Sequence, residues 1–403
     1  MKAGATLLNA ILLASTSLFA AKKQPEPPAP QPKCCIPQGE PLPCCICPSF
    51  NAPAAINVNY KTCNCMCSDW NANVNFSFIY WYAGEDGLKL ASTGALNGGV
   101  LYYNENIQTV NQDFDYKPGF KVGLGLIWAH EWEFRAEYTW YRARNVTHSG
   151  SLSGTVLTGG IPTTTAANGT AVWVVDDWFL AGAGGQALSG SDVASVWRLN
   201  MDLIDGVAGR PFYQGRRVIV SPYGGLRAAL IRQSMTVSLT EATGLFTGAP
   251  FAVGTIPSQP IKSHNFSNSW AIGPRFGANC EFLLPLGMRL EGDLAASILY
   301  TKYTSLKHRE DNASTSFNTG PFTSQIDDYS SVRPEADCSL GFGWGTYFGC
   351  RDYHIDFSAK YEFMIFWAQN MIRSALDDTL TGTGPSPSNL YLHGLTLNGR
   401  FDF

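Results

Sequence analysis

The chain has 403 residues, of which 45% are hydrophobic and 15% charged, and its formal net charge is −4. Such a mild acidic balance excludes nucleic-acid binding through a basic surface. Beyond the N-terminus there is no run of about 18 uncharged apolar residues, so the sequence also excludes transmembrane helices.

Residues 1–21 have the layout of a cleaved secretory signal. Lys2 precedes an apolar stretch from Leu7 to Leu18, and small residues, Ala20 and Ala21, follow it. This order of a charged start, an apolar core and a small-residue exit is typical of signal peptides. We therefore expect residues 1–21 to be removed and the mature protein to leave the cytoplasm.

Residues 22–72 differ in composition from the rest of the chain. Ten of the 23 prolines lie between Pro25 and Pro53. Proline disfavours helices and central strands, so we predict an extended Pro/Cys-rich segment that faces the periplasm. A disordered linker with incidental cysteines is the alternative.

Eight of the eleven cysteines lie in this segment, at Cys34, Cys35, Cys44, Cys45, Cys47, Cys63, Cys65 and Cys67. In an exported protein they meet an oxidising compartment, which favours disulfide bonds. A metal site is the rival interpretation. Structural zinc usually has wider gaps between paired cysteines, and these thiols are adjacent or singly spaced without a nearby histidine. The odd total leaves at least one thiol for an intermolecular bond or a free state.

From about residue 73, apolar and polar residues alternate with the period of a β-strand. One run, Tyr353 to Trp367, is roughly three times as long as an average soluble strand. Many of its polar positions, and those of Met288 to Tyr300, are charged, and charges at this density need water or each other. The alternating runs, in chain order, are Asn75–Tyr82, Phe120–Trp128, Trp132–Arg142, Val196–Asp205, Val218–Gln233, Trp270–Leu284, Met288–Tyr300, Asp337–Phe348, Tyr353–Trp367 and Tyr391–Phe403.

These runs predict an all-β fold, a transmembrane antiparallel β-barrel over residues 73–403, with lipid outside and water inside. At roughly 20 to 27 residues for each strand with its loop, the barrel would have about 12 to 16 strands. Polar stretches such as 149–170, 243–268 and 307–330 suit external loops, and short connectors at 129–131 and 285–287 suit periplasmic turns. The run that ends at Phe403 is expected to close the barrel.

Three stretches resemble the major outer membrane protein-like family of Legionella and of chlamydia-related bacteria. They are Ser221–Ala229, Trp270–Gly277 with its Gly-Pro-Arg-Phe-Gly string, and Leu392–Leu397. The resemblance implies a β-barrel in the bacterial outer membrane, often cysteine-rich and disulfide cross-linked, that acts as a porin or surface protein. The Pro/Cys-rich head matches no motif of that family.

A porin needs charged side chains that point into its lumen, where they set selectivity through the local field. Each candidate has an alternative role, which is to pair across strands and hold an inward network. The candidates for lining the pore are Glu133, Arg135, Glu137, Arg198, Arg227, Arg275, Glu281, Arg289, Glu291, Asp293 and Asp356.

Six tryptophans near predicted strand ends are expected at the membrane interface, where indole rings are favoured. They are Trp81, Trp128, Trp132, Trp140, Trp344 and Trp367. Cys280 and Cys338 fall on predicted outward faces, and a bond between Cys338 and Cys350 is conceivable.

Catalysis finds little support, because the sequence lacks a His-Glu-x-x-His motif, a nucleophile elbow and a phosphate loop. We therefore expect no enzyme, no cofactor and no metal site, although a hydrolase that uses His354 with Asp352 or Asp356 stays open.

The leading hypothesis is passive diffusion of small polar solutes through a barrel in the outer-membrane lipid, with the cysteines linking it to other cysteine-rich envelope proteins. The alternative is a structural or adhesive surface protein with a plugged lumen, and association of copies of the chain is left open.

Overall fold

The structure is a computed structural model. It describes residues 70–97, 100–102, 107–128, 132–152, 155–158, 167–175, 178–179, 187–215, 217–240, 243–245, 261–311, 321–348, 353–381 and 387–403. The predicted signal peptide and nearly all of the Pro/Cys-rich segment lie outside these ranges. So do the eight clustered cysteines from Cys34 to Cys67, and Cys350.

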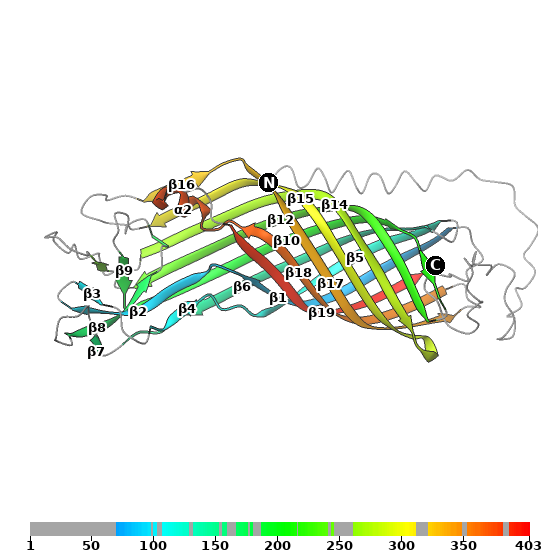
Figure 1. Ribbon diagram of the computed structural model, residues 1–403, viewed down its shortest axis with the longest axis horizontal. Helices are drawn as coiled ribbons and strands as arrows, with labels where there is room; N and C mark the ends of the chain where they lie inside the picture. Colours follow the sequence, from blue (N-terminus) through cyan, green and yellow to red (C-terminus); the bar gives the residue numbers. More distant parts are fainter. Residues whose placement is uncertain are drawn as a thin grey trace, which may run out of the picture. The chain divides into compact units, whose positions relative to one another are not determined.

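Among the described residues, ten long strands form a closed antiparallel β-barrel (Figure 1). Each strand pairs with the next barrel strand in the chain, and the last pairs with the first, from Asn73 opposite Asp402 to Glu85 opposite Leu390. The ten are β1 (Trp70–Glu85), β5 (Tyr116–Trp128), β6 (Trp132–His148), β10 (Asp192–Gly209), β12 (Val218–Thr240), β14 (Ile261–Leu283), β15 (Met288–Asp311), β17 (Tyr329–Phe348), β18 (Tyr353–Asn370) and β19 (Ser388–Asp402).

The predicted all-β barrel is thus confirmed, but the expected number of 12 to 16 strands is too high. Residues 73–403 divided among ten strands give about 33 residues for each strand with its connection. The strands are longer than expected: β12 and β14 have 23 residues each and β15 has 24. β14 begins and β15 ends inside stretches that the composition had suggested were loops.

The two ends of the barrel differ in their connections. At one end, here called the short-turn end, a few residues join β5 to β6 and β17 to β18, the 3-10 helix η3 (Pro285–Gly287) joins β14 to β15, and a loop with β11 (Tyr213–Gln214) joins β10 to β12. Leu286 and Gly287 of η3 have φ angles of 64° and 75°, and such left-handed backbone suits glycine. The five connections at the opposite, long-loop end are longer.

At the long-loop end, strands from three connections form a second sheet. It contains β2 (Lys89–Asn97), β3 (Val100–Tyr102), β4 (Thr109–Asn111), β7 (Thr155–Thr158), β8 (Ala167–Val175), β9 (Ala187–Gly190) and β13 (Thr243–Leu245). The other two connections hold β16 (Phe322–Ile326) and helix α2 (Ser374–Thr381), which lie together in Figure 1. None of the helices in the described ranges has the length and apolar character to span a membrane.

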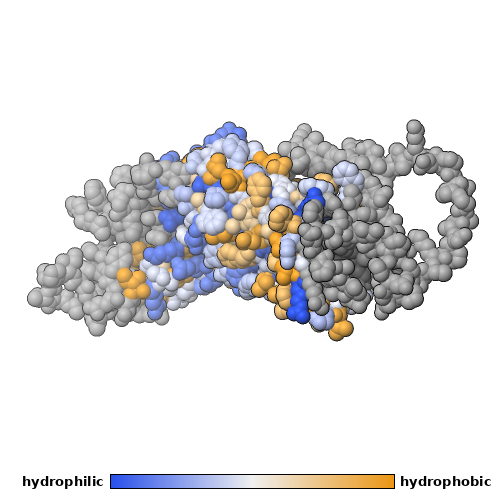
Figure 2. All heavy atoms as spheres, turned by 45° about the vertical axis from the view of Figure 1, so that its right-hand side comes forward, coloured by the Kyte–Doolittle hydropathy of each residue, from blue (hydrophilic) through white to orange (hydrophobic). Residues whose placement is uncertain are grey.

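The outer wall of the barrel carries a wide band of exposed apolar side chains. Leu124, Phe276, Leu294, Leu340 and Phe342 are each more than 60% exposed, although they are large and apolar. On the face drawn in Figure 2, hydrophobic residues gather in a band across the strands, with hydrophilic residues beside it. An apolar surface of this extent is stable only against lipid, because in water it would drive aggregation.

Aromatic rings border the band. Near the short-turn end, Trp128, Trp132 and Trp344 are between 41% and 48% exposed. Toward the long-loop end, Tyr80 stacks on Tyr116 with ring centroids 5.5 Å apart. Such rings prefer the membrane–water interface, so they bound the lipid-contacting part of the wall.

Trp81 is an exception to the interface prediction for tryptophans. Its side chain is only 1% exposed and points into the barrel, and its indole Nε1 donates a hydrogen bond to Thr396 Oγ1 at 3.1 Å. Its neighbours Tyr80 and Tyr82 take the outward positions on β1. Proximity to a strand end does not decide which face a residue occupies; alternation does.

Candidate functional site: the lumen of the barrel

Ten of the eleven predicted pore-lining residues lie on the inward faces of their strands. Arg135, Glu137, Arg227, Arg275 and Asp293 line a cavity in the lumen. The other five pair with inward partners nearer the short-turn end, and they are Glu133, Glu281, Arg289, Glu291 and Asp356. Arg198, the eleventh, is exposed on the outer wall.

The central ion network of the lumen is built around Arg227 on β12. Its guanidinium donates two parallel hydrogen bonds to Asp205, each 2.7 Å, and a third to Glu335 Oε1 at 2.7 Å. Asp337 is the shared partner, because it accepts from Arg227 at 3.0 Å and from both terminal nitrogens of Arg275 at 2.5 and 2.9 Å. Bidentate pairs of this kind are strong and fix geometry.

A second network crosses the lumen nearer the short-turn end. Arg289, only 4% exposed, forms ion pairs with Asp356 and Glu291, and Glu281 Oε2 lies 3.9 Å from its Nε. Lys360 Nζ contacts Glu291 Oε2 at 2.5 Å. Positive and negative charges therefore alternate from β14 through β15 to β18.

A third network includes the closing strand. Arg400 bonds Glu133 Oε1 at 3.0 Å and Asp402 Oδ1 at 2.7 Å. The other oxygen of Asp402 lies 2.8 Å from His354 Nδ1. The hydrolase hypothesis paired His354 with Asp352 or Asp356; Asp356 lies on the same inward face of β18, and Asp352 lies outside the described residues. Among the residues that the structure covers, no group of His, Cys, Asp and Glu could hold a metal ion.

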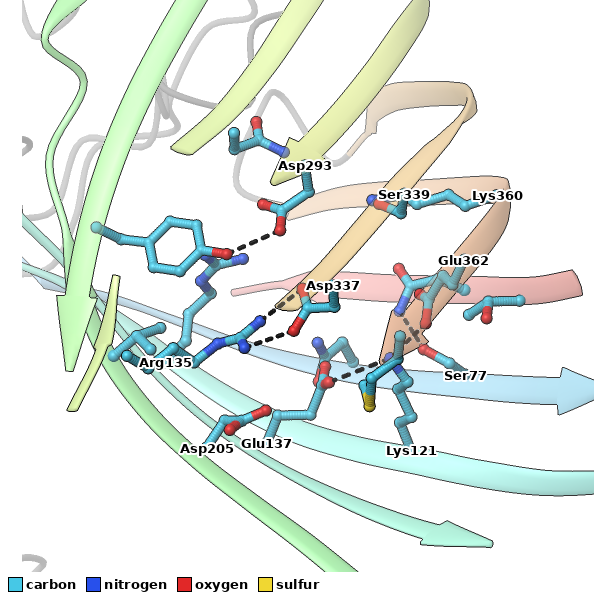
Figure 3. A pocket seen from close by; sticks show the side chains of 18 of the residues that line it. Ser77, Lys121, Arg135, Glu137, Asp205, Asp293, Asp337, Ser339, Lys360 and Glu362 are labelled. Atoms are coloured by element: carbon cyan, nitrogen blue, oxygen red, sulfur yellow. Dashed lines mark hydrogen bonds and ion pairs between the residues drawn. The ribbon is translucent and has the colours of Figure 1, made fainter. Parts of the chain in front are cut away.

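A cavity of about 170 Å³ lies between these networks (Figure 3). Figure 3 shows Lys121, Glu137 and Glu362 on one side of it and Asp293 and Arg135 on another. Lys121 Nζ lies 2.8 Å from Glu362, and the Tyr223 hydroxyl donates to Asp293 at 2.8 Å. Six basic side chains and five carboxylates line the cavity, so its charge is almost balanced: Lys121, Arg135, Arg227, Arg275, Lys360 and Arg400 against Glu137, Asp205, Asp293, Asp337 and Glu362.

Toward the long-loop end, the lumen changes from polar to apolar. Inward side chains of β1, β6, β10, β12, β14, β15, β18 and β19 form one buried hydrophobic cluster, here called the apolar layer. Trp81, Tyr141, Leu199, Met201 and Phe366 are each 0–1% exposed within it. The Tyr141 hydroxyl donates to the carbonyl of Trp81 at 2.7 Å, so this polar atom is satisfied. Side chains of the barrel wall, together with residues of the connections such as Leu90 and Trp178, therefore fill this level of the lumen.

Glu85, the last residue of β1, is buried among side chains of the apolar layer. It accepts hydrogen bonds from the Trp197 indole at 3.1 Å and from Gln233. The outward neighbours of these partners are Arg198 and Arg232, both exposed, so Glu85 lies above the lipid-contacting wall. Burial raises the pKa of Glu85 to about 8, and the nearby Asp86 raises it further while the Trp197 hydrogen bond opposes the change.

The position of Arg198 corrects its assignment to the pore. On β10 the alternation places Trp197, Leu199 and Leu203 inside the barrel, so Arg198 must point outward. The assignment assumed that polar faces point inward along a whole strand. This holds beside lipid, but at the long-loop end the outer wall meets water and the pattern reverses.

Several inward charged residues were not among the candidates. They include Lys121, Asp205, Glu335, Asp337, Lys360, Glu362, Arg400 and Asp402. Two of them share a strand face with a residue that was chosen: Lys360 and Glu362 alternate with the outward residues of β18 as Asp356 does. The signal was present in the alternation, but only the cross-strand register reveals which charges meet.

A closed antiparallel barrel with an apolar outer wall, aromatic borders and charged inner face defines a bacterial outer-membrane β-barrel protein. A family model built for the Legionella pneumophila major outer membrane protein precursor matches residues 62–403. The chain therefore belongs to this family, and its place is the bacterial outer membrane. The resemblance noted in the sequence is confirmed.

Similarity to solved structures is low. The outer membrane protease OmpT of Escherichia coli is 11% identical, with a TM-score of 0.34 over 83% of this chain and 96% of that one. A FadL homologue of Pseudomonas aeruginosa is 8% identical, with a TM-score of 0.22 over 88% of this chain and 93% of its own. Among curated proteins, no sequence matches.

Proposed function

We propose that this protein is a surface protein held in the outer membrane by a barrel whose lumen is closed. The observation that carries the proposal is the apolar layer, in which Trp81, Tyr141, Met201 and Phe366 are packed without solvent exposure. A conducting porin needs a water-filled path along its lumen. Barrels of eight strands are just filled by side chains and those of 16 to 18 leave a channel, so ten strands favour the filled kind.

The layer is built into the wall, and this supports a permanent closure. Its side chains belong to barrel strands with continuous antiparallel pairing, such as the 18 register pairs between β10 and β12 from Asp192 to Gly209. A loop can leave a lumen without breaking the barrel, whereas a wall residue moves only with its strand. On the short-turn side, the ion networks around Arg227 and Arg289 add a second obstruction.

The working surface in this proposal is the long-loop end, which we place outside the cell. Outer-membrane barrels have short periplasmic turns and long external loops. Here the long connections carry a sheet of their own, and Trp173, Trp178 and Phe179 of the β6–β10 connection join the same buried cluster as the apolar layer. The barrel thus supports an ordered external platform, and no catalytic step is assigned to it.

Solute uptake by vesicles tests this function. The full chain, folded into phosphatidylcholine vesicles and checked for heat-modifiable migration, should allow no faster osmotic swelling in small sugars or amino acids than empty vesicles. Swelling that falls with solute size would show an open lumen and overturn the proposal.

The second candidate function is the diffusion channel, the leading hypothesis from the sequence. The cavity of about 170 Å³ favours it, because balanced charges such as Lys121, Glu137 and Glu362 keep this level of the lumen wet. On the scale of one water per roughly 10 to 15 Å³ of such volume, the cavity holds on the order of ten waters. For conduction the apolar layer would have to open, and then small polar solutes would be the permeants.

Cross-linking through the cysteines from Cys34 to Cys67 is part of the proposal and rests on the sequence. Cys280 and Cys338, on the barrel, are exposed on the outer wall without a disulfide. If the clustered thiols join other cysteine-rich envelope proteins or further copies of the chain, envelope extracts should show large species that collapse with reductant. Identical migration with and without reductant would refute the cross-linking.

A further inference from the structure

Three arginines stand together on the outer wall near the long-loop end. Arg144 on β6, Arg198 on β10 and Arg232 on β12 all occupy exposed, outward positions. Arg198 is directly opposite Arg144 in the antiparallel register, and Arg232 is opposite Asn200, two residues from Arg198. We call these three residues the arginine patch.

The patch has no internal counter-charge. Like charges on directly opposed strand positions repel and destabilise the sheet. Within the described part of the chain, none of the three arginines has a hydrogen bond or ion pair. The neighbouring carboxylate, Asp202, is already taken, because Arg142 donates two hydrogen bonds to it at 2.8 and 2.9 Å and Tyr138 a third at 2.7 Å.

The height of the patch on the wall indicates what covers it. Leu230 pairs with Trp270 across β12 and β14, and both are 37% exposed at the border of the apolar band. Arg232 is the next outward residue beyond Leu230. On β6, Trp140 precedes Arg142 and Arg144 in the same way. Because indole rings mark the interface, the guanidinium groups lie at the level of the lipid headgroups.

We propose that the arginine patch binds the phosphate of a phosphorylated lipid headgroup in the outer leaflet. Guanidinium groups match phosphate oxygens with paired hydrogen bonds, and three on adjacent strands supply the charge that such a group needs. The acyl chains of the same lipid would lie along the apolar wall directly below, beside Leu230 and Ile204. Basic clusters at membrane interfaces recognise anionic headgroups in this way.

Lipid retention by the purified full chain tests the proposal. The folded protein in a zwitterionic detergent is titrated with bisphosphorylated lipid A, with lipid A stripped of its phosphates, and with inorganic phosphate, and bound lipid is counted by native mass spectrometry. The wild type should bind the phosphorylated lipid and prefer it over the stripped lipid, whereas phosphate alone should bind weakly.

Arg198→Gln should weaken binding of the phosphorylated lipid about tenfold, because the variant loses one charge-assisted hydrogen bond to the phosphate. Arg198→Lys should fall between it and the wild type. The matched control is Arg309→Gln, which removes an exposed arginine that already pairs with Asp311 at 3.0 Å, and should bind as the wild type does.

Equal affinity of Arg198→Gln and wild type for the phosphorylated lipid would overturn the proposal. So would equal binding of lipid with and without phosphate, or tight binding of inorganic phosphate alone. If Arg198→Gln instead changes the oligomeric state and leaves lipid binding intact, the patch is an interface between copies of the chain. Heat-modifiable migration of each variant verifies that it is folded.

Discussion

The two halves of the lumen close the same barrel by opposite means. Near the short-turn end, Arg227, Arg275 and Arg289 cross the space in ion pairs, whereas near the long-loop end Trp81, Met201 and Phe366 fill it as a hydrophobic core does. The outer wall changes in the opposite sense, from lipid-facing to polar. The composition of the interior at each level thus follows what surrounds the wall there: the interior is polar where the wall faces lipid and apolar where the wall faces water.

The physical consequences of the two kinds of filling differ. A buried ion pair is stabilising only while all partners are present, because a lone buried charge costs several kcal/mol. An apolar layer tolerates the loss of single groups better, since each contributes through its own buried area. Substitutions in the two halves should therefore have distinct energetic signatures.

The largest effect is expected from Arg227→Met in the polar half. Loss of this guanidinium leaves Asp205, Glu335 and Asp337 with too little positive charge, and we expect the free energy of unfolding to fall by about 3 to 5 kcal/mol. Urea unfolding in phospholipid vesicles measures it. Arg232→Met on the same strand is the control and should change stability by less than about 1 kcal/mol, because that arginine is exposed. Similar losses for both variants would mean that the ion network adds nothing specific.

Leu199→Ala in the apolar half should cost about 2 to 4 kcal/mol, through lost burial and the cavity left behind. The cavity would be enclosed by the other side chains of the apolar layer, so the variant should remain as impermeable as the wild type. Equilibrium unfolding gives the energy, and vesicle swelling gives the permeability. A variant that loses no stability but leaks would show that Leu199 lines a passage.

Much of the barrel could be predicted from the sequence, and the failures have a common cause. The alternation of apolar and polar residues predicted the strands and the inward faces of Glu133, Arg275 and Asp293. It did so because a wall in contact with lipid must turn its polar residues inward. The prediction failed for Arg198, because the polar face turns outward at that level. It failed for Trp81 because the residue was assigned from its position near a strand end and not from its face. The sequence of a single strand does not indicate at which residue its outer face leaves the lipid.

The number of strands and the partners of the inward charges could not be predicted from the sequence. The number of strands depends on where each strand ends, and β14 and β15 continue through polar residues such as Asn265 and His308. These two side chains are buried, with Nδ1 of His308 2.8 Å from Oδ1 of Asn265. The shared use of Asp337 by Arg227 and Arg275 depends on register across the barrel, since the three residues come from β17, β12 and β14. Sequence spacing carries no trace of such a contact.

An effect that is smaller for each pH unit is expected at Glu85, within the apolar half. Because burial raises its folded-state pKa to about 8, the folded state binds a proton that the unfolded state releases at lower pH. Stability should therefore fall as pH rises from about 5 to 8, by at most about 1.4 kcal/mol per pH unit from this group. Glu85→Gln should flatten that slope, which urea titrations at several pH values would detect. An unchanged slope in the variant would assign the pH dependence to other groups.

The smallest effect is expected on the outer wall. In detergent without anionic lipid, Arg144→Gln removes the repulsion with Arg198 and should raise stability by about 0.2 to 0.5 kcal/mol. Arg309→Gln, which loses its pair with Asp311, should instead lower stability by a few tenths of a kcal/mol at most, on the order of an exposed ion pair. The opposite ordering of the two variants would contradict the unpaired state of the arginine patch.

Single-channel recording of the wild-type protein in planar bilayers tests the closed lumen most directly. Protein whose heat-modifiable migration shows it to be folded should insert without producing regular current steps at moderate voltage. Reproducible, uniform steps from the wild type would contradict the closed lumen and establish a channel through the apolar layer.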